Sequence, residues 1–505
     1  MTRSGAEYVR GLRDGRTVYL NGERVADVTT HPAFAEGVQA IASLFDLAND
    51  PANRELMTYP SPRDGRPIDK WWLIPRSYDD LVARRRALKA VADQSYGLLG
   101  RSPDHMASFL CAWAGSPAFF ARGGQQFAEN IQRFYAKAAD EDLYLSYAIV
   151  QPTVDRTRPA HQQPEPYLYA GVVKEKDGGI VLRGAQMLAT GGVMSDYVFI
   201  SVILPLRPGD EDYAISLVVP NDAPGLKLYT RRPYTLGATT VFDYPLTTRF
   251  DETDSLVVLD DVFVPWEDVF VYRDVALTFG QFSETAAHSL GNLQAHIRSW
   301  AKLEFLVGLV KRICERNGQL AKPETIALLG DLASRVALVE GLVLAAEVNA
   351  RLDEFGVMCP DRTMVYASQT LQAQLYPEVM TMVRGLMGGS VIQLPSSAAD
   401  LLSPTTAPDV ERYVRWAEAP AGERVKLLKL LWDLVGSEFA ARHLQYEMFY
   451  AGEPAAVKGR EYRAFDWAAA EALVDRCLAS YDLTTPSAAT APPAAPSLEA
   501  GTSRG

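Results

Sequence analysis

The chain has 505 residues, of which 48% are apolar and 22% are charged, and its formal net charge is −12 at pH 7. Because a single hydrophobic core stops growing at roughly 250–300 residues, we expect two or three domains. The acidic balance argues against a nucleic-acid-binding protein, since domains of that class are usually basic.

The four cysteines lie far apart in the sequence, at Cys111, Cys314, Cys359 and Cys477. They form neither a CxxC motif nor a cluster with histidine, so we expect no structural zinc or other metal site. Residues 1–16 lack the apolar core of a signal peptide, and the sequence contains no apolar run of about 18 residues that could span a membrane. These features favour a cytoplasmic protein with free thiols.

Residues 1–148 have mostly helical patterns. Between residues 79 and 99, apolar side chains recur at roughly helical spacing while basic residues occupy the other face. Upstream, polar and apolar residues alternate on both sides of the pair Asn21-Gly22, which is typical of a two-residue β-hairpin turn. We therefore expect an N-terminal helical domain that contains one hairpin.

Between residues 149 and 282 the pattern changes to short β-branched runs. Three of these runs, at residues 196–204, 213–220 and 255–265, are separated by Gly, Pro, Asp and Asn. Several short strands with turn residues between them predict a sheet or barrel domain. The runs do not alternate with helices, so a doubly wound parallel sheet is not expected.

Helical patterns return between residues 283 and 483, and they are long. Residues 296–313, 324–352 and 424–449 are predicted helices with apolar stripes, of the kind that pack in a bundle. We expect most of these apolar residues to form the core of a C-terminal helix bundle. The last residues, 484–505, are rich in Pro, Ala and Ser and predict a disordered tail.

Arg101 and His105 lie four residues apart at a predicted helix start, because Ser102 or Asp104 would cap a helix that has Pro103 at its first position. A guanidinium beside the positive end of a helix dipole favours an anion. The segment therefore has two interpretations: it only starts a helix, or it also holds an anionic aromatic ligand.

Two shorter patterns also have a structural and a functional interpretation. Thr190 precedes the pair Gly191-Gly192, where the glycines would either form a plain turn or let the backbone approach a flat ligand. Asp155 and Arg156 follow an apolar stretch, and a surface salt bridge is the usual explanation of such a pair.

His288 lies where the strand-rich region gives way to the bundle. A lone histidine is more often structural than catalytic, yet it can take a phenolic proton near neutral pH. Residues 449–454 end a predicted helix with Gly452 and Pro454, as helix ends commonly do. No GxGxxG motif follows a predicted strand, so nothing supports a nicotinamide-binding domain.

Eight segments follow one another in the order found in a known family. They are residues 13–34, 96–106, 149–156, 184–192, 260–272, 298–309, 394–400 and 425–454. In this order the chain resembles the oxygenase components of 4-hydroxyphenylacetate 3-hydroxylases, whose relatives include 4-coumarate 3-hydroxylases, chlorophenol monooxygenases and aryl hydroxylases of antibiotic pathways. The resemblance extends over roughly residues 5–483.

The resemblance implies an acyl-CoA-dehydrogenase-like α+β fold that is mainly α. Its parts would be an N-terminal helical domain (1–148), a middle β-barrel (149–282) and a C-terminal helix bundle (283–483), assembled as a homotetramer. It also implies a two-component monooxygenase, in which a separate flavin reductase supplies reduced FAD (FADH2) and O2 is the co-substrate. A phenolate would react with a flavin C4a-hydroperoxide and gain a hydroxyl ortho to its own oxygen, without a metal.

The resemblance further suggests roles for individual residues. Arg101 matches an arginine that contacts the phenolic substrate, and His288 lies near the histidine base of some relatives. The positions that match flavin-binding stretches are Thr153, Val154, Asp155, Arg156, Thr190, Tyr450, Ala451, Gly452 and Glu453. His105 and Tyr147 belong to the substrate pocket, but members acting on 4-hydroxyphenylacetate usually have tyrosine and histidine there, respectively. This exchange weakens the case for 4-hydroxyphenylacetate as substrate. Residues 189–192 and 481–483 look closer to the coumarate hydroxylases and antibiotic-pathway members, which implies a larger or carrier-tethered phenol.

Three alternatives remain open at this level. A dehalogenating chlorophenol monooxygenase is a variant of the same chemistry. A flavin dehydrogenase of the acyl-CoA type would share the architecture, but it would need a glutamate base over tightly bound oxidised FAD. A non-catalytic scaffold that binds a carrier protein is the third.

Overall fold

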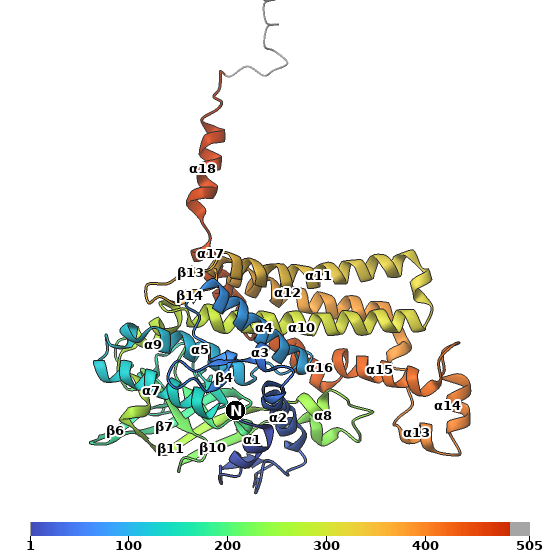
Figure 1. The fold of residues 1–505 in the computed structure, drawn as a ribbon, viewed down its shortest axis with the longest axis horizontal. Helices are drawn as coiled ribbons and strands as arrows, with labels where there is room; N and C mark the ends of the chain where they lie inside the picture. The colour runs from blue at the N-terminus through green and yellow to red at the C-terminus, as the bar shows by residue number, and fades with distance from the viewer. Residues whose placement is uncertain (1, 485–505) are drawn as a thin grey trace, which may run out of the picture.

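The computed structural model describes residues 2–484, and the chain is mainly α-helical with mixed β-sheets (Figure 1). The predicted tail lies almost wholly outside the described residues. The helices of the N-terminal region are α1 (Gly5–Gly11), α2 (Ala35–Asn49), α3 (Arg54–Met57), α4 (Tyr78–Gln94), α5 (Pro103–Gly115), α6 (Pro117–Phe120) and α7 (Gln125–Glu141). α4 confirms the helix predicted after residue 79. It starts with a capping box, in which Ser77 and Asp80 each accept from the other's backbone N–H.

The predicted hairpin is confirmed by β1 (Val18–Leu20) and β2 (Glu23–Arg24), which pair antiparallel. Both turn residues have positive φ, 54° at Asn21 and 84° at Gly22, as a type I′ turn requires. The hairpin joins a larger sheet, because β1 also pairs in parallel with β10 (Leu226–Thr230).

Two sheets are formed mainly by the middle of the chain. The first has the order β2, β1, β10, β11 (Asp254–Pro265), β7 (Gly179–Thr190) and β6 (Gly171–Lys176). The second has the order β12 (Val269–Tyr272), β9 (Ile215–Pro220), β8 (Tyr197–Ile200) and β5 (Leu145–Ala148). Two-stranded ribbons are formed by β3 (Thr58–Pro60) with β4 (Pro67–Asp69), and by β13 (Arg351–Leu352) with β14 (Met358–Cys359). β8, β9 and β11 confirm the three strands predicted from the β-branched runs.

The expected closed β-barrel is not found among the described residues. β2 and β6 stand at the edges of the first sheet, and β12 and β5 stand at the edges of the second. No two of the strands pair between the sheets, although one isolated bridge joins Val150, just after β5, to Met187 of β7. β1, β2 and β5 all precede residue 149, so the sheets take strands from both sides of the predicted domain limit. The three domain ranges themselves remain a prediction.

The C-terminal region is a bundle of long helices. Two helices precede this region, α8 (Thr247–Phe250) and α9 (Val275–Ser283). The helices of the region itself are α10 (Ala287–Arg316), α11 (Pro323–Val348), α12 (Arg362–Met387), α13 (Ala399–Leu402), α14 (Ala407–Tyr413), α15 (Ala421–Val435), α16 (Glu438–Phe449), α17 (Pro454–Ala464) and α18 (Trp467–Leu478). α10, α11 and α12 lie side by side as the longest elements (Figure 1).

The single helix predicted over residues 424–449 is wrong, because the structure has two helices there. α15 ends at Val435, and Ser437 starts α16 by accepting from the backbone N–H of Ala440 at 3.1 Å. A Cβ at Gly436 would lie 2.4 Å from the ring of Trp432, so only glycine fits this close approach. The apolar pattern continues through the break and therefore hides it.

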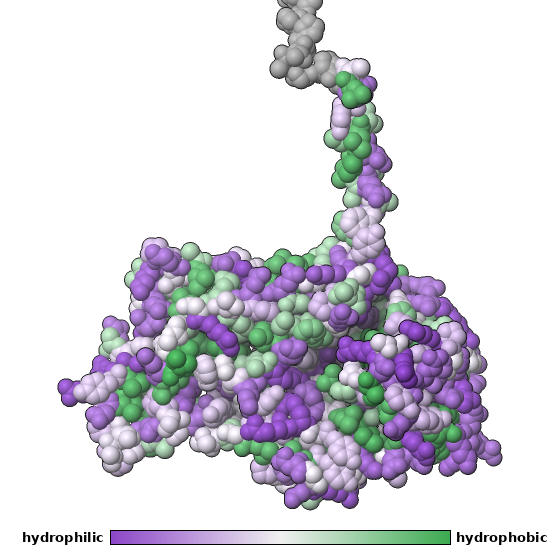
Figure 2. All heavy atoms as spheres, turned by 180° about the vertical axis from the view of Figure 1, so that it is seen from behind, coloured by the Kyte–Doolittle hydropathy of each residue, from purple (hydrophilic) through white to green (hydrophobic). Residues whose placement is uncertain are grey.

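α18 projects away from the rest of the chain (Figure 1), and none of its residues is buried. Figure 2 shows apolar surface along this helix, where Leu473, Val474 and Leu478 are more than half exposed. Over residues 2–484, we find no helix with the length and hydropathy that a membrane span requires.

Candidate active site

The helix start predicted at Ser102 is confirmed, since α5 begins at Pro103 with Ser102 as its N-cap residue. The Ser102 hydroxyl does not cap the backbone; it donates to Asp104, which also accepts from Gln294 of α10 at 3.0 Å. These buried contacts hold the first turn of α5 against α10. They place Arg101, the residue before the cap, at the junction of the helices.

Arg101 is a buried cation, with 7% of its surface exposed. Its Nη1 lies 3.1 Å from Nε2 of His105 and donates to Oη of Tyr446 at 2.8 Å. Within residues 2–484, no carboxylate forms an ion pair with the guanidinium, and its Nε and Nη2 donate no hydrogen bond. Burial of a charge without a counter-ion is costly, so this position favours an anionic ligand.

The ring of Tyr446 lies between three arginines. The guanidinium carbons of Arg101 and Arg298 are each 5.2 Å from its centroid, and that of Arg442 is 5.0 Å away. Burial raises the pKa of Tyr446 to about 12, although Arg101 and Arg298 act to lower it. The phenol of Tyr446 is therefore neutral and orients Arg101 without cancelling its charge.

The other two arginines at this ring are paired with carboxylates. Arg298 lies 2.6 Å from Glu447, and Arg442 lies 2.8 Å from Asp254. Burial opposes ionisation of both acids, but the arginines lower the pKa of Glu447 and of Asp254 far below the usual range. Both pairs are thus fully charged at neutral pH. Arg101 is the arginine of the three whose guanidinium forms no ion pair within residues 2–484, although the buried Glu252 carboxylate beside its backbone N–H raises its pKa.

His105 and Tyr147, the two positions that depart from the family pattern, are stacked on each other. Their ring centroids are 5.3 Å apart with an interplanar angle of 22°, and Arg101 lies 5.1 Å above the ring of Tyr147. Burial, reinforced by the charge of Arg101, holds the pKa of His105 well below 6.5. The three predicted substrate-pocket residues are therefore brought together, and the histidine among them is neutral.

Thr190 lies at the end of β7 and belongs to the same polar network. Its hydroxyl donates to Asp254 at 2.6 Å. The following residue, Gly191, has a φ of 73°, and a Cβ there would lie 2.1 Å from Oη of Tyr144 and 3.8 Å from the carbonyl of Arg101. Only glycine permits this approach, so the predicted glycine turn sits directly beside the Arg101 backbone.

Tyr450 and the three residues after it form the turn between α16 and α17. The ring of Tyr450 stacks on that of Tyr446 at 6.0 Å, and its hydroxyl lies 3.3 Å from Nδ1 of His296. Ala451 accepts from Arg460 through its carbonyl, Gly452 has a φ of 104°, and Glu453 is the N-cap residue of α17. This turn is connected to Arg101 through Tyr446.

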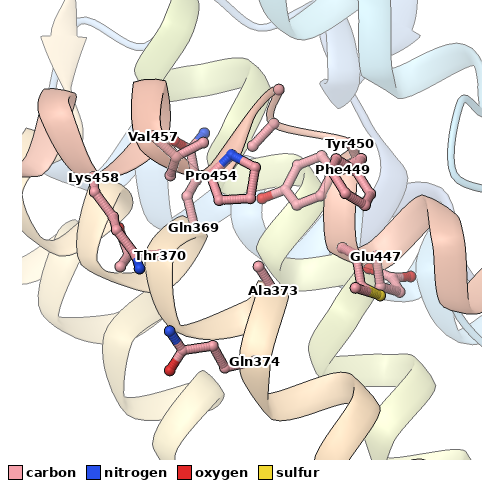
Figure 3. A pocket seen from close by; sticks show the side chains of 13 residues that line it. Gln369, Thr370, Ala373, Gln374, Glu447, Phe449, Tyr450, Pro454, Val457 and Lys458 are labelled. Atoms are coloured by element: carbon pink, nitrogen blue, oxygen red, sulfur yellow. The ribbon is translucent and has the colours of Figure 1, made fainter.

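A cavity of about 120 Å³ opens between α12, α16 and α17 (Figure 3). Tyr450 and Lys458 lie on opposite sides of it, and Ala451 and Gly452 also line it. The side chain of Gln369, which is 2% exposed, also lines this cavity, and its Nε2 has no hydrogen-bond partner. An unpartnered buried amide indicates room for a ligand or water that accepts a hydrogen bond.

Thr153, Val154, Asp155 and Arg156 lie on the loop after β5, and none of them is buried. Asp155 accepts from the backbone N–H and hydroxyl of Thr157, and it pairs with Arg158 at 3.2 Å rather than with Arg156. No hydrogen bond or ion pair links this stretch to Arg101. The flavin contact expected for residues 153–156 remains a prediction.

His288 is separate from the group around Arg101. It lies in the first turn of α10, 9% exposed, with its ring 5.4 Å from that of Tyr366. Burial, followed by the charges of Arg460 and Arg362, lowers the pKa of His288 to about 3. A histidine with this pKa is a weak base, and the catalytic role expected for His288 remains a prediction.

The residues that the sequence interpretation missed come mainly from one face of α16. Arg442 and Tyr446 are these residues, and they are spaced at a step of four, in line with Tyr450, which the sequence interpretation had named and which directly follows the helix. Glu252 links this face to α5, since its carboxylate accepts from the backbone N–H of Arg101 at 2.6 Å and lies 3.3 Å from Arg442. The helical spacing of Arg and Tyr was the available signal.

Comparison with known families decides the family of the chain. The model of the 4-hydroxyphenylacetate 3-hydroxylase N-terminal region matches residues 4–271, and that of the C-terminal region matches residues 279–479. The chain belongs to the 4-hydroxyphenylacetate 3-hydroxylase family. This confirms the resemblance inferred from the order of the sequence segments.

Relatives within the 4-hydroxyphenylacetate 3-hydroxylase family differ in their substrates. The 4-hydroxyphenylacetate 3-monooxygenase oxygenase component of Thermus thermophilus is 34% identical over 92% of this chain and 95% of its own. The pyoverdin chromophore biosynthetic protein PvcC of Pseudomonas aeruginosa is 34% identical over 95% and 96%. A Streptomyces globisporus monooxygenase, named for a chlorohydroxyphenyl amino acid on a peptidyl-carrier protein, is 36% identical over 89% and 85%.

Solved structures of the family have the same fold. The oxygenase component HpaB, in complex with FAD and 4-hydroxyphenylacetate, matches with a TM-score of 0.90 and 33% identity over 95% of this chain and 99% of its own. A 4-hydroxybutyryl-CoA dehydratase of N. maritimus, 20% identical, matches with a TM-score of 0.86 over 96% and 97% and shows the fold alone. The expected acyl-CoA-dehydrogenase-like architecture is confirmed, apart from the closed barrel.

Proposed function

We propose that the protein is the oxygenase component of a two-component, reduced-FAD-dependent monooxygenase that hydroxylates a phenol ortho to its hydroxyl. One observation carries this proposal: Arg101 is buried beside His105, Tyr147 and Tyr446, and no carboxylate of the described residues forms an ion pair with its guanidinium. A phenolate can take the place of that ion-pair partner. Family membership adds support, because a solved relative binds FAD and 4-hydroxyphenylacetate.

The chemistry needs a phenolate, because ionisation makes the ring carbon ortho to the oxygen more nucleophilic. A free phenol has a pKa near 10, and a cation within hydrogen-bond distance lowers the pKa of an acid by about 1–3 units. Arg101 is placed to provide this effect, while burial lowers the pKa of His105 and of His288 and so makes both weak bases. Reduced FAD, when bound, would activate O2 for transfer of one oxygen atom to the ring.

We assign FAD binding to the loop over Thr153–Arg156, to Thr190 and to the turn over Tyr450–Glu453. Two buried amides fit a flavin, whose carbonyls and ring nitrogens accept hydrogen bonds. Gln151, just before the first loop, and Gln369, in the cavity beside the turn, each have an Nε2 without a partner. The close approach at Gly191 leaves the end of β7 free of side-chain bulk next to Arg101.

The proposal includes a flavin reductase as functional partner, because relatives are named as oxygenase components. The reductase would use reduced nicotinamide, which favours a cytoplasmic location. The phenol is either a free small molecule or is tethered to a carrier protein, as in the name of the Streptomyces globisporus relative.

We also propose a homotetramer. α18 contacts little else in its own chain and exposes Leu473, Val474 and Leu478, which a second copy of the chain could cover. Light scattering of the protein and of a Leu473→Glu/Leu478→Glu variant tests this assembly. We expect a tetramer for the former and smaller species for the latter; a monomeric wild type would contradict the proposal.

The dehydrogenase alternative requires a free glutamate base at the flavin. Glu447 is the buried glutamate of the described residues that lines the cavity, but it is saturated by Arg298, Lys302 and Gln372. It therefore has no lone pair available to take a proton from a substrate. This arrangement favours the monooxygenase.

The test combines the purified protein with a generic flavin reductase, NADH, FAD and a panel of free phenols and phenolic thioesters. Products with one added oxygen atom, detected by mass and by catechol chemistry, support the proposal. Release of halide from chlorophenols would identify the dehalogenating variant. Absence of oxygenated product from every phenol, or equal turnover of an Arg101→Ala variant, would contradict it.

A further inference from the structure

We propose that His105 is a fixed hydrogen-bond donor, through Nδ1–H, that selects phenols carrying a second, uncharged acceptor group such as an ester, amide or thioester carbonyl. The inference rests on the proposed function and adds the class of substrate. His105 then contributes to substrate selection and does not act as a base.

The tautomer of His105 follows from its contact with Arg101. A guanidinium has hydrogen-bond donors only, and Nη1 of Arg101 lies 3.1 Å from Nε2 of His105. Nε2 must therefore offer its lone pair to Arg101. The neutral ring then has its proton on Nδ1, at the other side of the imidazole.

The Nδ1–H of His105 has no partner within residues 2–484. His105 is 3% exposed, and its Nδ1 is fully buried without a hydrogen bond. Buried donors are nearly always paired with protein, water or ligand, because an unpaired one loses its hydrogen bond to water. The neighbouring rings of Phe109 and Tyr147 offer no acceptor through the contacts that the structure shows. A ligand atom is the natural partner.

The surroundings of His105 define what that ligand atom can be. The guanidinium of Arg101 has no ion-pair partner among the described residues, so it can pair with one phenolate. Tyr147 is partly exposed, and its hydroxyl donates no hydrogen bond within the described chain. These side chains are therefore one cation, Arg101, and two further hydrogen-bonding groups, His105 and Tyr147. A second anionic group would find no counter-ion beside these rings, whereas a neutral carbonyl can accept from Nδ1–H.

Two substitutions separate the two sides of the imidazole ring. In His105→Asn, the side-chain NH2 replaces the Nδ1–H donor, and the acceptor for Arg101 is lost. In His105→Gln, the longer side chain reaches the Nε2 position and can accept from Arg101, but no donor remains at Nδ1. Each variant therefore keeps one side of the ring and serves as the matched control of the other.

Equilibrium dialysis measures binding of two phenols, methyl 4-hydroxycinnamate with a carbonyl and 4-ethylphenol without one. For the ester, we expect the Kd to rise about 3- to 10-fold in His105→Gln and to change less in His105→Asn, as loss of one neutral hydrogen bond implies. For 4-ethylphenol, the two variants should have the same Kd. Equal effects of both variants on both phenols would overturn the inference.

The pH dependence of turnover is a second readout, which separates a hydrogen-bond donor at His105 from a catalytic base. The acid limb of the wild-type profile should be unchanged in His105→Gln, because His105 does not take the proton. Its loss in both variants would show that His105 is a base and would overturn the inference. Failure of the proposed function is distinct, since it would appear as absence of oxygenated product while the dialysis still compares the variants.

Discussion

Arg101 donates from Nη1 to the hydroxyl of Tyr446 across 2.8 Å, and this hydrogen bond joins the start of α5 to the middle of α16. The two residues are 345 positions apart in the chain. Tyr446 in turn stacks on Tyr450 at the edge of the cavity. The contact therefore connects the proposed phenolate site with the proposed flavin-binding turn.

Replacing Tyr446 with Phe should weaken phenol binding by about 1 kcal/mol, because Arg101 loses the hydrogen bond that orients it. The ring and its packing between the arginines are kept, so the fold should be unchanged. The measurement is the Kd of an accepted phenol together with circular dichroism. Tyr376→Phe is the control, because its buried hydroxyl has no hydrogen-bond partner; an equal loss in both variants would contradict the orienting role.

The pH dependence of hydroxylation should follow the phenol and not a histidine. Burial keeps the pKa of His105 well below 6.5 and lowers that of His288 to about 3, so both are neutral across the working range. We expect the acid limb of kcat/KM to move to lower pH when a nitro group lowers the pKa of the phenol. An acid limb that stays near pH 6.5 for every phenol would instead indicate a histidine base.

Exchanging the two stacked residues should change substrate choice more than stability. Because the rings of His105 and Tyr147 lie 5.3 Å apart at 22°, the double variant His105→Tyr/Tyr147→His conserves the pair and its volume. We expect relative kcat/KM to shift from the neutral ester toward 4-hydroxyphenylacetate, with an apparent Tm close to wild type. The two single variants control for loss of the stacked pair. An unchanged ratio of the kcat/KM values for the two phenols in the double variant would contradict a role of the pair in substrate choice.

A pair of buried acids away from the site should make stability depend on pH. Asp69 and Asp142 are 0% and 2% exposed, and burial followed by the charge of Asp142 raises the pKa of Asp69 well above 3.8. The folded state then binds a proton that the unfolded chain releases, so the contribution of this pair to stability is fully present below about pH 4 and is lost as the pH rises through the raised pKa.

Asp69→Asn removes this pH dependence because asparagine keeps a donor for Asp142 without titrating. We expect the apparent Tm at pH 8 to rise, by the equivalent of about 1–3 kcal/mol, and the gain to shrink toward pH 4. Scanning calorimetry at both pH values makes the measurement, with the exposed Asp177→Asn as control. A gain of equal size at both pH values would refute the proton-sharing explanation.

The sequence predicts elements whose cause is local. The turn at Asn21-Gly22 needs two positive φ values, and the start of α5 needs Pro103 at its first position, so both could be found from a few residues. The break at Gly436 was missed because the apolar spacing does not change across it. Its cause, the ring of Trp432 one turn earlier, is a matter of close packing.

Sheet order and the site depend on contacts between distant residues, which spacing does not encode. β1 pairs with β10 about 200 residues later, and the separate sheets could not be distinguished from a barrel by strand patterns alone. Arg101 was found as a candidate through its place at a helix start. That its guanidinium lacks an ion-pair partner among the described residues emerges only when Tyr446 and the paired arginines surround it.

The most direct test is the ionisation of 4-nitrophenol bound to the protein, followed by the absorbance of its phenolate as pH is varied. The account predicts that the pKa of the bound phenol is lower than in water by about 1–3 units, and that Arg101→Ala removes the shift. Arg101→Lys should restore part of it, because the charge returns without the contacts to His105 and Tyr446. A bound phenol that ionises at the same pH in wild type and in Arg101→Ala would contradict the account.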